Sequence, residues 1–178
     1  MKQRTTAAII LVAAMVLTLM GCSYASAMTV PGDDLFEYNG KFFSILDDLQ
    51  TTQKKVDAVC KPVPDYPVME NGEGSNIYQY DPVGNGQAQF MLVTFTNNGT
   101  EAVGQISIQK SDFKTSRGIG IGSPAKKVFD AYGKPNKVSG NGNFFHYNFD
   151  NYVILFYSMD GKVFSIDYFN LDYYNSRK

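Results

Sequence analysis

Apolar residues recur at helical spacing in two similar stretches, residues 54–62 (KKVDAVCKP) and residues 126–135 (KKVFDAYGKP). In each stretch the positions i, i+3 and i+4 after the paired lysines are apolar, which predicts one buried face of a short helix. The apolar positions of the first stretch align with those of the second: Val56 with Val128, Val59 with Ala131, and Cys60 with Tyr132. The pattern therefore predicts that the chain contains one helical unit twice.

Residues at the ends of the second stretch predict where its helix begins and ends. Ser123 can cap the helix, and Pro124 suits its first turn. Gly133 fits the left-handed position after the last turn, and Pro135 prevents continuation. The first stretch lacks the glycine but also ends in Lys61-Pro62.

Each predicted helix is followed by three segments with the aromatic and β-branched residues typical of strands. Asn98-Gly99 and Asp160-Gly161 favour two-residue hairpin turns. The predicted fold is α+β, with two tandem repeats (34–112 and 113–178), each a short helical segment packed on a three- to four-stranded antiparallel sheet. The strand segments are residues 77–80, 90–99 and 103–108, then 144–149, 152–161 and 163–168.

The first 22 residues resemble the signal sequence of bacterial lipoproteins. Lys2 and Arg4 precede an apolar run (residues 7–20) that is too short to span a bilayer. The run ends in LMGC, which is similar to a lipobox. This resemblance implies a signal peptide (1–21), lipidation of Cys22, a flexible tether (22–33), and anchoring to the membrane of a bacterial cell envelope, facing outside the cytoplasm. The alternative is an ordinary signal peptide cut after Ala25 or Ala27.

The stretch TSRGIGIGSPAKKVFDAYGKP (residues 115–135) resembles a segment of small exported bacterial lipoproteins, in which a Gly-Ile lead precedes a helix ending in Tyr-Gly-x-Pro and three strands follow. The same unit occurs in the tandem-repeat β-lactamase inhibitor protein family and, once, in the small lipoprotein of the outer-membrane barrel assembly machinery. The resemblance implies a fold, and it places no inhibitory residue on this chain.

The alternation of side chains along the last hairpin suggests a binding surface. A two-residue turn at 160–161 would place Tyr157, Leu155 and Val153 on the helix side. The other face would then expose an aromatic strip, and exposed apolar patches usually mark binding surfaces. The predicted partner-binding residues are Tyr152, Ile154, Phe156 and Phe169. The alternative is that the sheets or residues 171–178 cover this strip.

Composition and candidate chemistry argue against an enzyme. The formal charge of −1 lacks the basic excess of a nucleic-acid-binding protein. Gly118, Gly120 and Gly122 precede a helix but do not complete a nucleotide-binding fingerprint. His146 is the only histidine, so no zinc site can be assembled. We expect Cys60 to be a buried apolar residue, and we predict no catalytic residue, metal or cofactor.

The sequence thus predicts a non-catalytic module that binds an unidentified envelope or extracellular protein, as an enzyme inhibitor or an envelope assembly factor. The alternative is a binder of small molecules or cell-wall ligands, or a weak hydrolase, that uses a cleft between the repeats.

Overall fold

The computed structural model describes residues 30–63, 69–70, 75–109 and 112–176, and these residues form an α+β fold with antiparallel sheets. The described helices are α1 (Leu49–Asp57), α2 (Ala125–Tyr132) and α3 (Leu171–Ser176). The strands are β1 (Leu35–Tyr38), β2 (Lys41–Ser44), β3 (Lys61–Pro62), β4 (Met69–Glu70), β5 (Asn76–Asp81), β6 (Phe90–Asn97), β7 (Thr100–Ile108), β8 (Lys114–Thr115), β9 (Lys137–Ser139), β10 (Phe144–Asn148), β11 (Tyr152–Met159) and β12 (Lys162–Asn170). The expected α+β class is confirmed, whereas the separate three- to four-stranded sheets expected for the two repeats are replaced by one shared sheet.

A nine-stranded sheet forms the centre of the protein, in the order β3-β5-β6-β7-β12-β11-β10-β9, with β4 also paired to β5. Strands β7 and β12 are antiparallel neighbours, and the pairing runs from Ile166 opposite Ile108 to Phe169 opposite Gln105. The two halves of the chain therefore share one continuous sheet. From this central pair the strand order reads outward as β7-β6-β5 on one side and β12-β11-β10 on the other.

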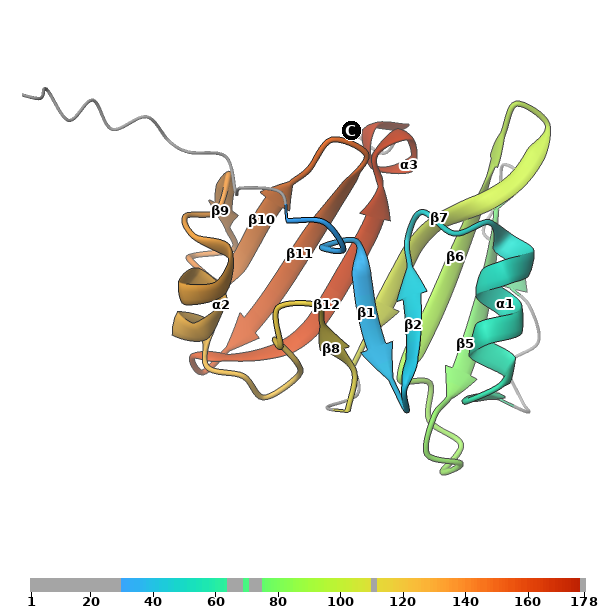
Figure 1. The fold of residues 1–178 in the computed structure, drawn as a ribbon, viewed down its shortest axis with the longest axis horizontal. Coiled ribbons are helices and arrows are strands. Elements are labelled where there is room, and N and C mark those ends of the chain that lie inside the picture. The colour runs from blue at the N-terminus through green and yellow to red at the C-terminus, as the bar shows by residue number, and fades with distance from the viewer. Residues whose placement is uncertain (1–29, 64–68, 71–74, 110–111, 177–178) are drawn as a thin grey trace, which may run out of the picture.

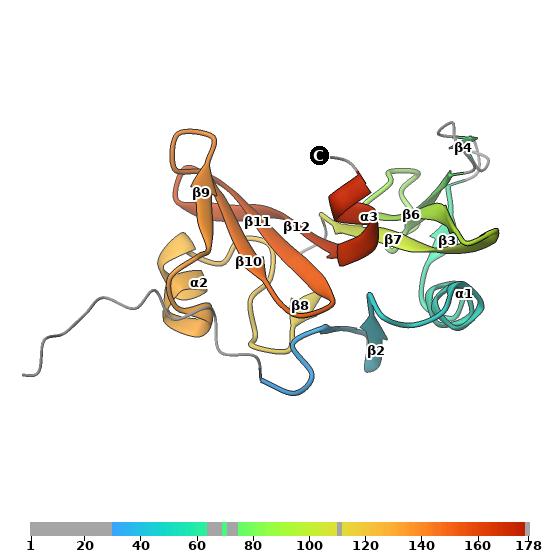
Figure 2. The same cartoon turned by 90° about the horizontal axis from the view of Figure 1, so that it is seen from above.

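One face of the large sheet is covered by α1, α2 and a second, three-stranded sheet of order β2-β1-β8, whereas α3 lies on the opposite side (Figures 1 and 2). Aromatic rings fill the space between the layers. Phe36 of β1 lies 6.1 Å from Phe90 and 5.2 Å from Tyr168 between ring centroids. Tyr132 of α2 lies 5.1 Å from Phe156. This covered face holds the main hydrophobic core.

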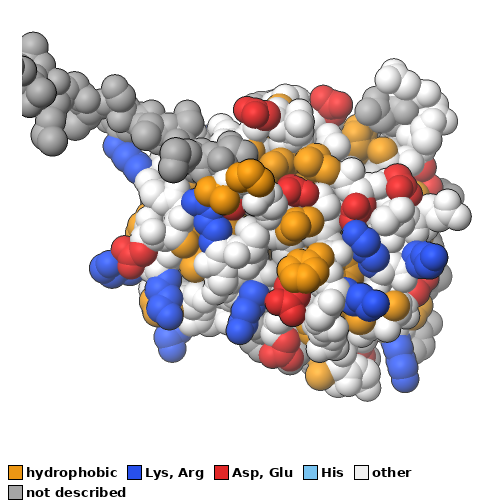
Figure 3. Space-filling model, viewed as in Figure 1, with side chains coloured by type: hydrophobic (Ala, Val, Ile, Leu, Met, Phe, Trp, Pro, Cys, Tyr) orange, Lys and Arg blue, Asp and Glu red, His pale blue; other side chains and the backbone are white. Residues whose placement is uncertain are grey.

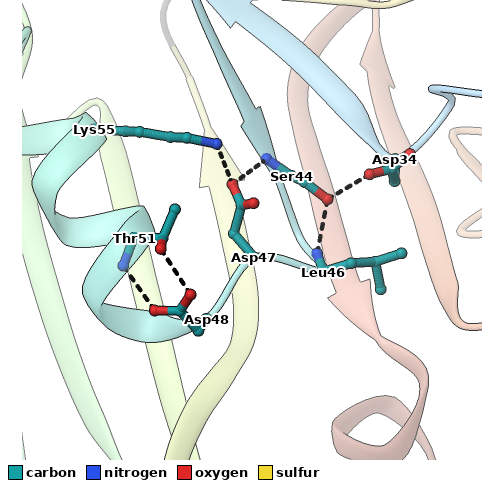
Figure 4. Close-up of polar contacts among 7 residues, drawn as sticks. All are labelled: Asp34, Ser44, Leu46, Asp47, Asp48, Thr51 and Lys55. Carbon is teal, nitrogen blue, oxygen red and sulfur yellow. Dashed lines mark hydrogen bonds and ion pairs between the residues drawn. The ribbon is translucent and has the colours of Figure 1, made fainter.

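The junction between β2 and α1 is fixed by side-chain hydrogen bonds (Figure 4). Asp48 caps α1, because its carboxylate accepts bonds from the Thr51 amide at 2.8 Å and the Thr51 hydroxyl at 2.7 Å. Asp47 accepts bonds from the Ser44 amide and from Lys55, and the Ser44 hydroxyl donates to Asp34. These bonds hold the first turn of α1 against the small sheet.

Helix α2 ends as the sequence predicts but begins differently. Gly133 follows the last turn with φ +75°, a conformation that glycine adopts without strain. Pro124 occupies the N-cap position, and no side chain caps the helix. The expected cap by Ser123 is wrong, because its hydroxyl instead accepts a bond from the Gly120 amide at 3.1 Å. That bond closes the glycine-rich turn before the helix.

Both long hairpins have the predicted two-residue turn, but each contains a β-bulge. Asn98 and Asp160 have φ of 50° and 52°, and the glycines after them are also left-handed. Register shifts follow between Val93 and Thr94 and between Tyr157 and Ser158. The extra residue makes Tyr157 pair with Ser165 where an unbroken register would pair it with Phe164.

The bulge in the second hairpin moves the residues of the predicted binding strip on β11 to the covered face of the sheet. Because the side-chain period of a strand is two, a shift by one residue moves a whole set of side chains to the other face. Phe156 therefore pairs with Ile166 and Ile154 with Tyr168, and these side chains face α2. The predicted exposure of Tyr152, Ile154 and Phe156 is wrong: all three belong to the core.

The chain is already folded at the end of the predicted tether. Asp33 is buried, and its carboxylate accepts bonds from Arg117, one of them at 2.7 Å from Nε. Arg117 also donates to the Ala131 carbonyl at 2.7 Å and lies over the Tyr132 ring. The signal peptide, Cys22 and the tether up to residue 29 lie outside the described residues. None of the described helices is long and apolar enough to cross a membrane.

Candidate functional site

The face of the large sheet opposite α1 and α2 carries the candidate site. We call it the open face, because the short α3 is the one described helix that packs on it (Figure 2). Its side chains alternate with those of the core along each strand. Gln105 and Ser107 of β7 lie beside Phe169 and Asp167 of β12. The seam between the two halves of the chain therefore runs through the middle of this face.

A hollow of about 390 Å³ lies on the open face across this seam. Its volume falls within the range of about 300 to 1,000 Å³ that is usual for ligand pockets. The first half of the chain contributes one side and the second half the other. We call this the seam hollow, and its lining residues are Met91, Gln105, Ser107, Gln109, Phe144, Tyr157, Phe164, Ser165 and Asp167.

The acid in the seam hollow is Asp167, which is 6% exposed. Gln105 Nε2 lies 3.3 Å from Asp167 Oδ2 and 2.9 Å from the Ser107 hydroxyl. Asp167 Oδ1 is buried and accepts no hydrogen bond of good geometry. Burial raises the pKa of Asp167 to about 6, although the nearby hydroxyl groups of Ser107, Tyr157 and Ser165 oppose this effect by stabilising the charge.

Aromatic rings form one wall of the seam hollow. The Tyr157 ring contacts the Phe144 ring at 5.1 Å and the Phe164 ring at 6.1 Å between centroids. Phe164 is 42% exposed, because it is the residue that the bulge adds to β12. The hollow thus combines an apolar wall with a polar floor that contains one carboxyl group.

Helix α3 covers the open face next to the seam hollow. Its Tyr173 ring lies 5.3 Å from the Phe95 ring and 6.4 Å from the Phe169 ring. Glycine at position 104 makes this contact possible, since a Cβ there would lie 2.7 Å from Tyr173 Cγ. Phe169, the fourth predicted contact residue, is consequently half-buried under α3.

His146 also lies on the open face, as its alternation with Phe145 and Tyr147 predicts. Its Nε2 is 3.0 Å from the Ser139 hydroxyl, and its Nδ1 is 3.4 Å from the Tyr174 hydroxyl. Burial and the nearby Lys137 lower the pKa of His146. In a catalytic triad, a carboxylate accepts a hydrogen bond from Nδ1 of the histidine and so orients the imidazole ring. In this protein, Nδ1 of His146 faces the hydroxyl group of Tyr174 instead.

The remaining candidates have structural roles. Cys60 is buried as expected, and burial raises the pKa of its thiol to about 12. Gly118 and Gly122 have positive φ in the turn that leads into α2. Within the described part of the chain, no three His, Cys, Asp or Glu side chains gather as metal ligands would.

An exposed apolar surface also lies on the covered side of the protein, over the β1–β2 hairpin (Figure 3). Figure 3 shows hydrophobic atoms over the β1–β2 hairpin, between acidic and basic side chains. Phe42 of this hairpin is 57% exposed. Because this surface is exposed and lies on the side opposite the seam hollow, Phe42 can serve as a control position in tests of the hollow.

Sequence reasoning missed the residues of the seam hollow but contained a signal for them. Asp167 interrupts an otherwise apolar and aromatic strand, and Gln105 and Ser107 alternate with Val103, Ile106 and Ile108. These patterns place the polar residues of β7 and β12 on the outer face correctly. Comparison with known proteins adds nothing to this picture, since no family model, curated protein or solved structure matches the chain significantly.

Proposed function

We propose that this protein is a lipid-anchored, extracytoplasmic binding module of a bacterial cell envelope, and that it holds a protein partner on the open face around the seam hollow. One observation carries the proposal. The large sheet is covered by α1, α2 and the three-stranded sheet on one side (Figure 2), whereas the other side presents a hollow with aromatic and polar residues from both halves of the chain. Interface centres are enriched in aromatic residues and methionine, and the hollow has both.

The location rests on Cys22, which we propose is lipidated after removal of residues 1–21. The acyl groups would fix the protein to the membrane, and residues 22–29 would give it reach. The buried Asp33 ends that reach, because it ties the chain to Arg117 of the second half. The enzyme inhibitor and the envelope assembly factor remain two forms of the same proposal.

The element order supports the proposal that the halves are tandem repeats. Helix α1 precedes β5, β6 and β7 as α2 precedes β10, β11 and β12. In each half the last hairpin combines a two-residue turn with a bulge, and the extra residue lies on the strand that follows the turn. A binding surface built at the junction of two similar units would then explain why the hollow straddles the seam.

Photo-crosslinking in cells tests the protein partner. A photoreactive phenylalanine at position 164 should give a discrete crosslinked adduct, because this side chain lines the hollow and is accessible. The same residue at position 42, which is more exposed but lies on the other side, should give none. Adducts from position 42 alone, or from neither position, would contradict the proposal.

A small-molecule or cell-wall ligand is the second candidate, and the volume of the hollow favours it specifically. It predicts no protein adduct at position 164. It also predicts that low-molecular-weight envelope extract protects the protein against thermal unfolding, and that Phe164→Ala reduces this protection.

A further inference from the structure

The chemistry of the seam hollow indicates which kind of side chain from a protein partner it would bind. We propose that it receives the ammonium or guanidinium group of a lysine or arginine side chain from the protein partner, with Asp167 as the counter-charge. The inference rests on the proposed function for the identity of the partner. It rests on the described residues for the chemistry of the hollow.

The first argument is an unbalanced buried charge. Asp167 is only 6% exposed to solvent, and its Oδ1 accepts no hydrogen bond of good geometry. A buried acceptor without a partner loses its hydration without compensation, and the loss is larger for a charged group. The residues that line the hollow include no Lys, Arg or His. Among the described residues that line the hollow, none therefore supplies a cation for this carboxylate.

The second argument is the aromatic wall. A cation within about 6 Å of an aromatic ring is attracted by the negative face of the ring, and more strongly where water is excluded. The rings of Phe144 from β10, Tyr157 from β11 and Phe164 from β12 line the hollow. An aliphatic stem with a cationic end would place methylene groups against this wall and its charge near Asp167.

The charged surroundings of Asp167 are simple. Tyr157, on the neighbouring strand β11, is the titratable group that lines the hollow with it. Burial and the Asp167 charge raise the pKa of Tyr157, so it stays neutral. On β7, the neighbours Gln105 and Ser107 carry no charge. His146 of β10 lies in the same cross-strand row as Asp167, with Leu155 between them, and burial and Lys137 lower its pKa. Among the residues that line the hollow, Asp167 is therefore the group whose charge changes near neutral pH, and Asp167→Asn separates its effect from that of His146.

The test measures binding of blocked amino acids by the full-length protein in a nonionic detergent, followed by NMR. The probes are the N-acetyl methylamides of arginine and lysine, and the neutral analogue is the citrulline derivative. At pH 7.5 the basic probes should bind at least tenfold more tightly than citrulline. At pH 5 their affinity should fall roughly tenfold, because a carboxyl of pKa about 6 is then about one-tenth ionised.

Two variants and their controls locate the effect. Asp167→Asn should remove the preference for basic probes, whereas Asp160→Asn in the exposed turn should keep it. Met91→Lys should place a lysine in the hollow, block the probes and lower the pKa of Asp167 below about 6. Met159→Lys, at an exposed methionine outside the hollow, should do neither.

The outcomes separate this inference from the proposed function. Equal binding of citrulline and arginine probes, or full binding by Asp167→Asn, would overturn the inference even if position 164 still crosslinks to a protein. Selective binding of basic probes without any crosslink would overturn the protein partner and assign the hollow to a free small amine. Selective binding together with a crosslink that Asp167→Asn weakens would support both.

Discussion

At the scale of single residues, Asp167 and Phe156 show how one strand pair separates site from core. Asp167 faces the open side of β12, and its carboxyl lies in the seam hollow. Phe156 faces the opposite way and touches Tyr132 and Tyr147. An acid with an unpartnered oxygen in a stable sheet is a cost that packing alone does not explain. Sites for ligands are where such costs are usually tolerated.

Asp167 should make the folded state sensitive to pH. Its pKa in the folded protein is about 6 against an ordinary value of 3.8, so the folded state binds the proton more tightly than the unfolded chain. The free energy of unfolding should therefore fall as the pH rises from about 4 to about 6, by up to about 3 kcal/mol. Asp48, Asp81 and Glu101 have lowered pKa values and contribute the opposite trend to both proteins. Urea unfolding across this range should therefore show the wild type losing stability relative to Asp167→Asn. Parallel curves would contradict the assignment.

Truncation of Phe156 should destabilise the whole fold. This ring is fully buried, and Phe→Ala changes at such positions cost about 3 to 5 kcal/mol. Phe164→Ala is the matched control, because its ring is 42% exposed and its loss should cost less than about 1 kcal/mol. Chemical denaturation compares the two. A small effect of Phe156→Ala would mean that its ring is not part of the core.

At the scale of elements, the sequence predicts the helices and strands better than it predicts which face of the sheet each side chain lies on. The helices around Val56 and Val128, the strands after them and both two-residue turns are present. The side chains of β11 face the opposite way from the prediction because its hairpin has a bulge, and a bulge leaves no clear mark on the hydrophobic pattern. Phe169 of β12, beyond the bulge, lies on the open face as predicted. The polar residues of the site also lie on this face, and their alternation with apolar residues along β7 was the signal for them.

The remainder of the site could not be predicted, because it depends on contacts between distant segments. Phe144 and Tyr157 come from the outer strands β10 and β11, and Met91 comes from β6. Only the pairing of β7 with β12 brings these strands into one surface. Helix α3 is also too short for its periodicity to predict it, and it is positioned by Tyr173 over Gly104.

The contact of α3 can be tested with a double-mutant cycle. Gly104→Ala would place a Cβ within 2.7 Å of the Tyr173 ring, so the helix or the strand must move, at a cost of about 1 to 3 kcal/mol. In a Tyr173→Ala background the same change should cost much less, because the ring is gone. Thermal unfolding of the four proteins measures the coupling. Additive effects would show that Tyr173 does not pack there.

At the scale of the whole molecule, the N-terminal segment connects the two halves. Strands β1 and β2 precede α1 in sequence, but β1 pairs with β8. The Asp33–Arg117 ion pair adds a buried connection between the same regions. The first described strands are therefore held by β8 and Arg117, which lie beyond the predicted repeat boundary at residue 112.

Loss of the Arg117 charge should destabilise this connection. Arg117→Gln leaves the buried Asp33 carboxylate without its cation, and removal of one partner of a buried pair costs about 3 to 5 kcal/mol. Lys126→Gln breaks the exposed pair with Asp130 and should cost less than about 1 kcal/mol. Equilibrium unfolding compares the two variants. Equal costs would show that the Asp33 pair is not desolvated.

Lipidation is the prediction that concerns the start of the chain. Labelled palmitate should enter the wild-type protein in cells, because Cys22 follows a lipobox-like stretch. Cys22→Ser should remove the label, whereas Cys60→Ser should keep it, since Cys60 is buried in the folded domain. Label in Cys22→Ser would assign the anchor to another residue, and no label in the wild type would favour an ordinary signal peptide.

The shared pairing of β7 and β12 has a consequence for any attempt to divide the protein. If each half were expressed alone, the nine-residue strand that now meets its neighbour would become a bare edge with unsatisfied amide and carbonyl groups. Antiparallel pairing with an identical strand from another copy would satisfy these groups. Isolated halves should therefore assemble as symmetric dimers or aggregate.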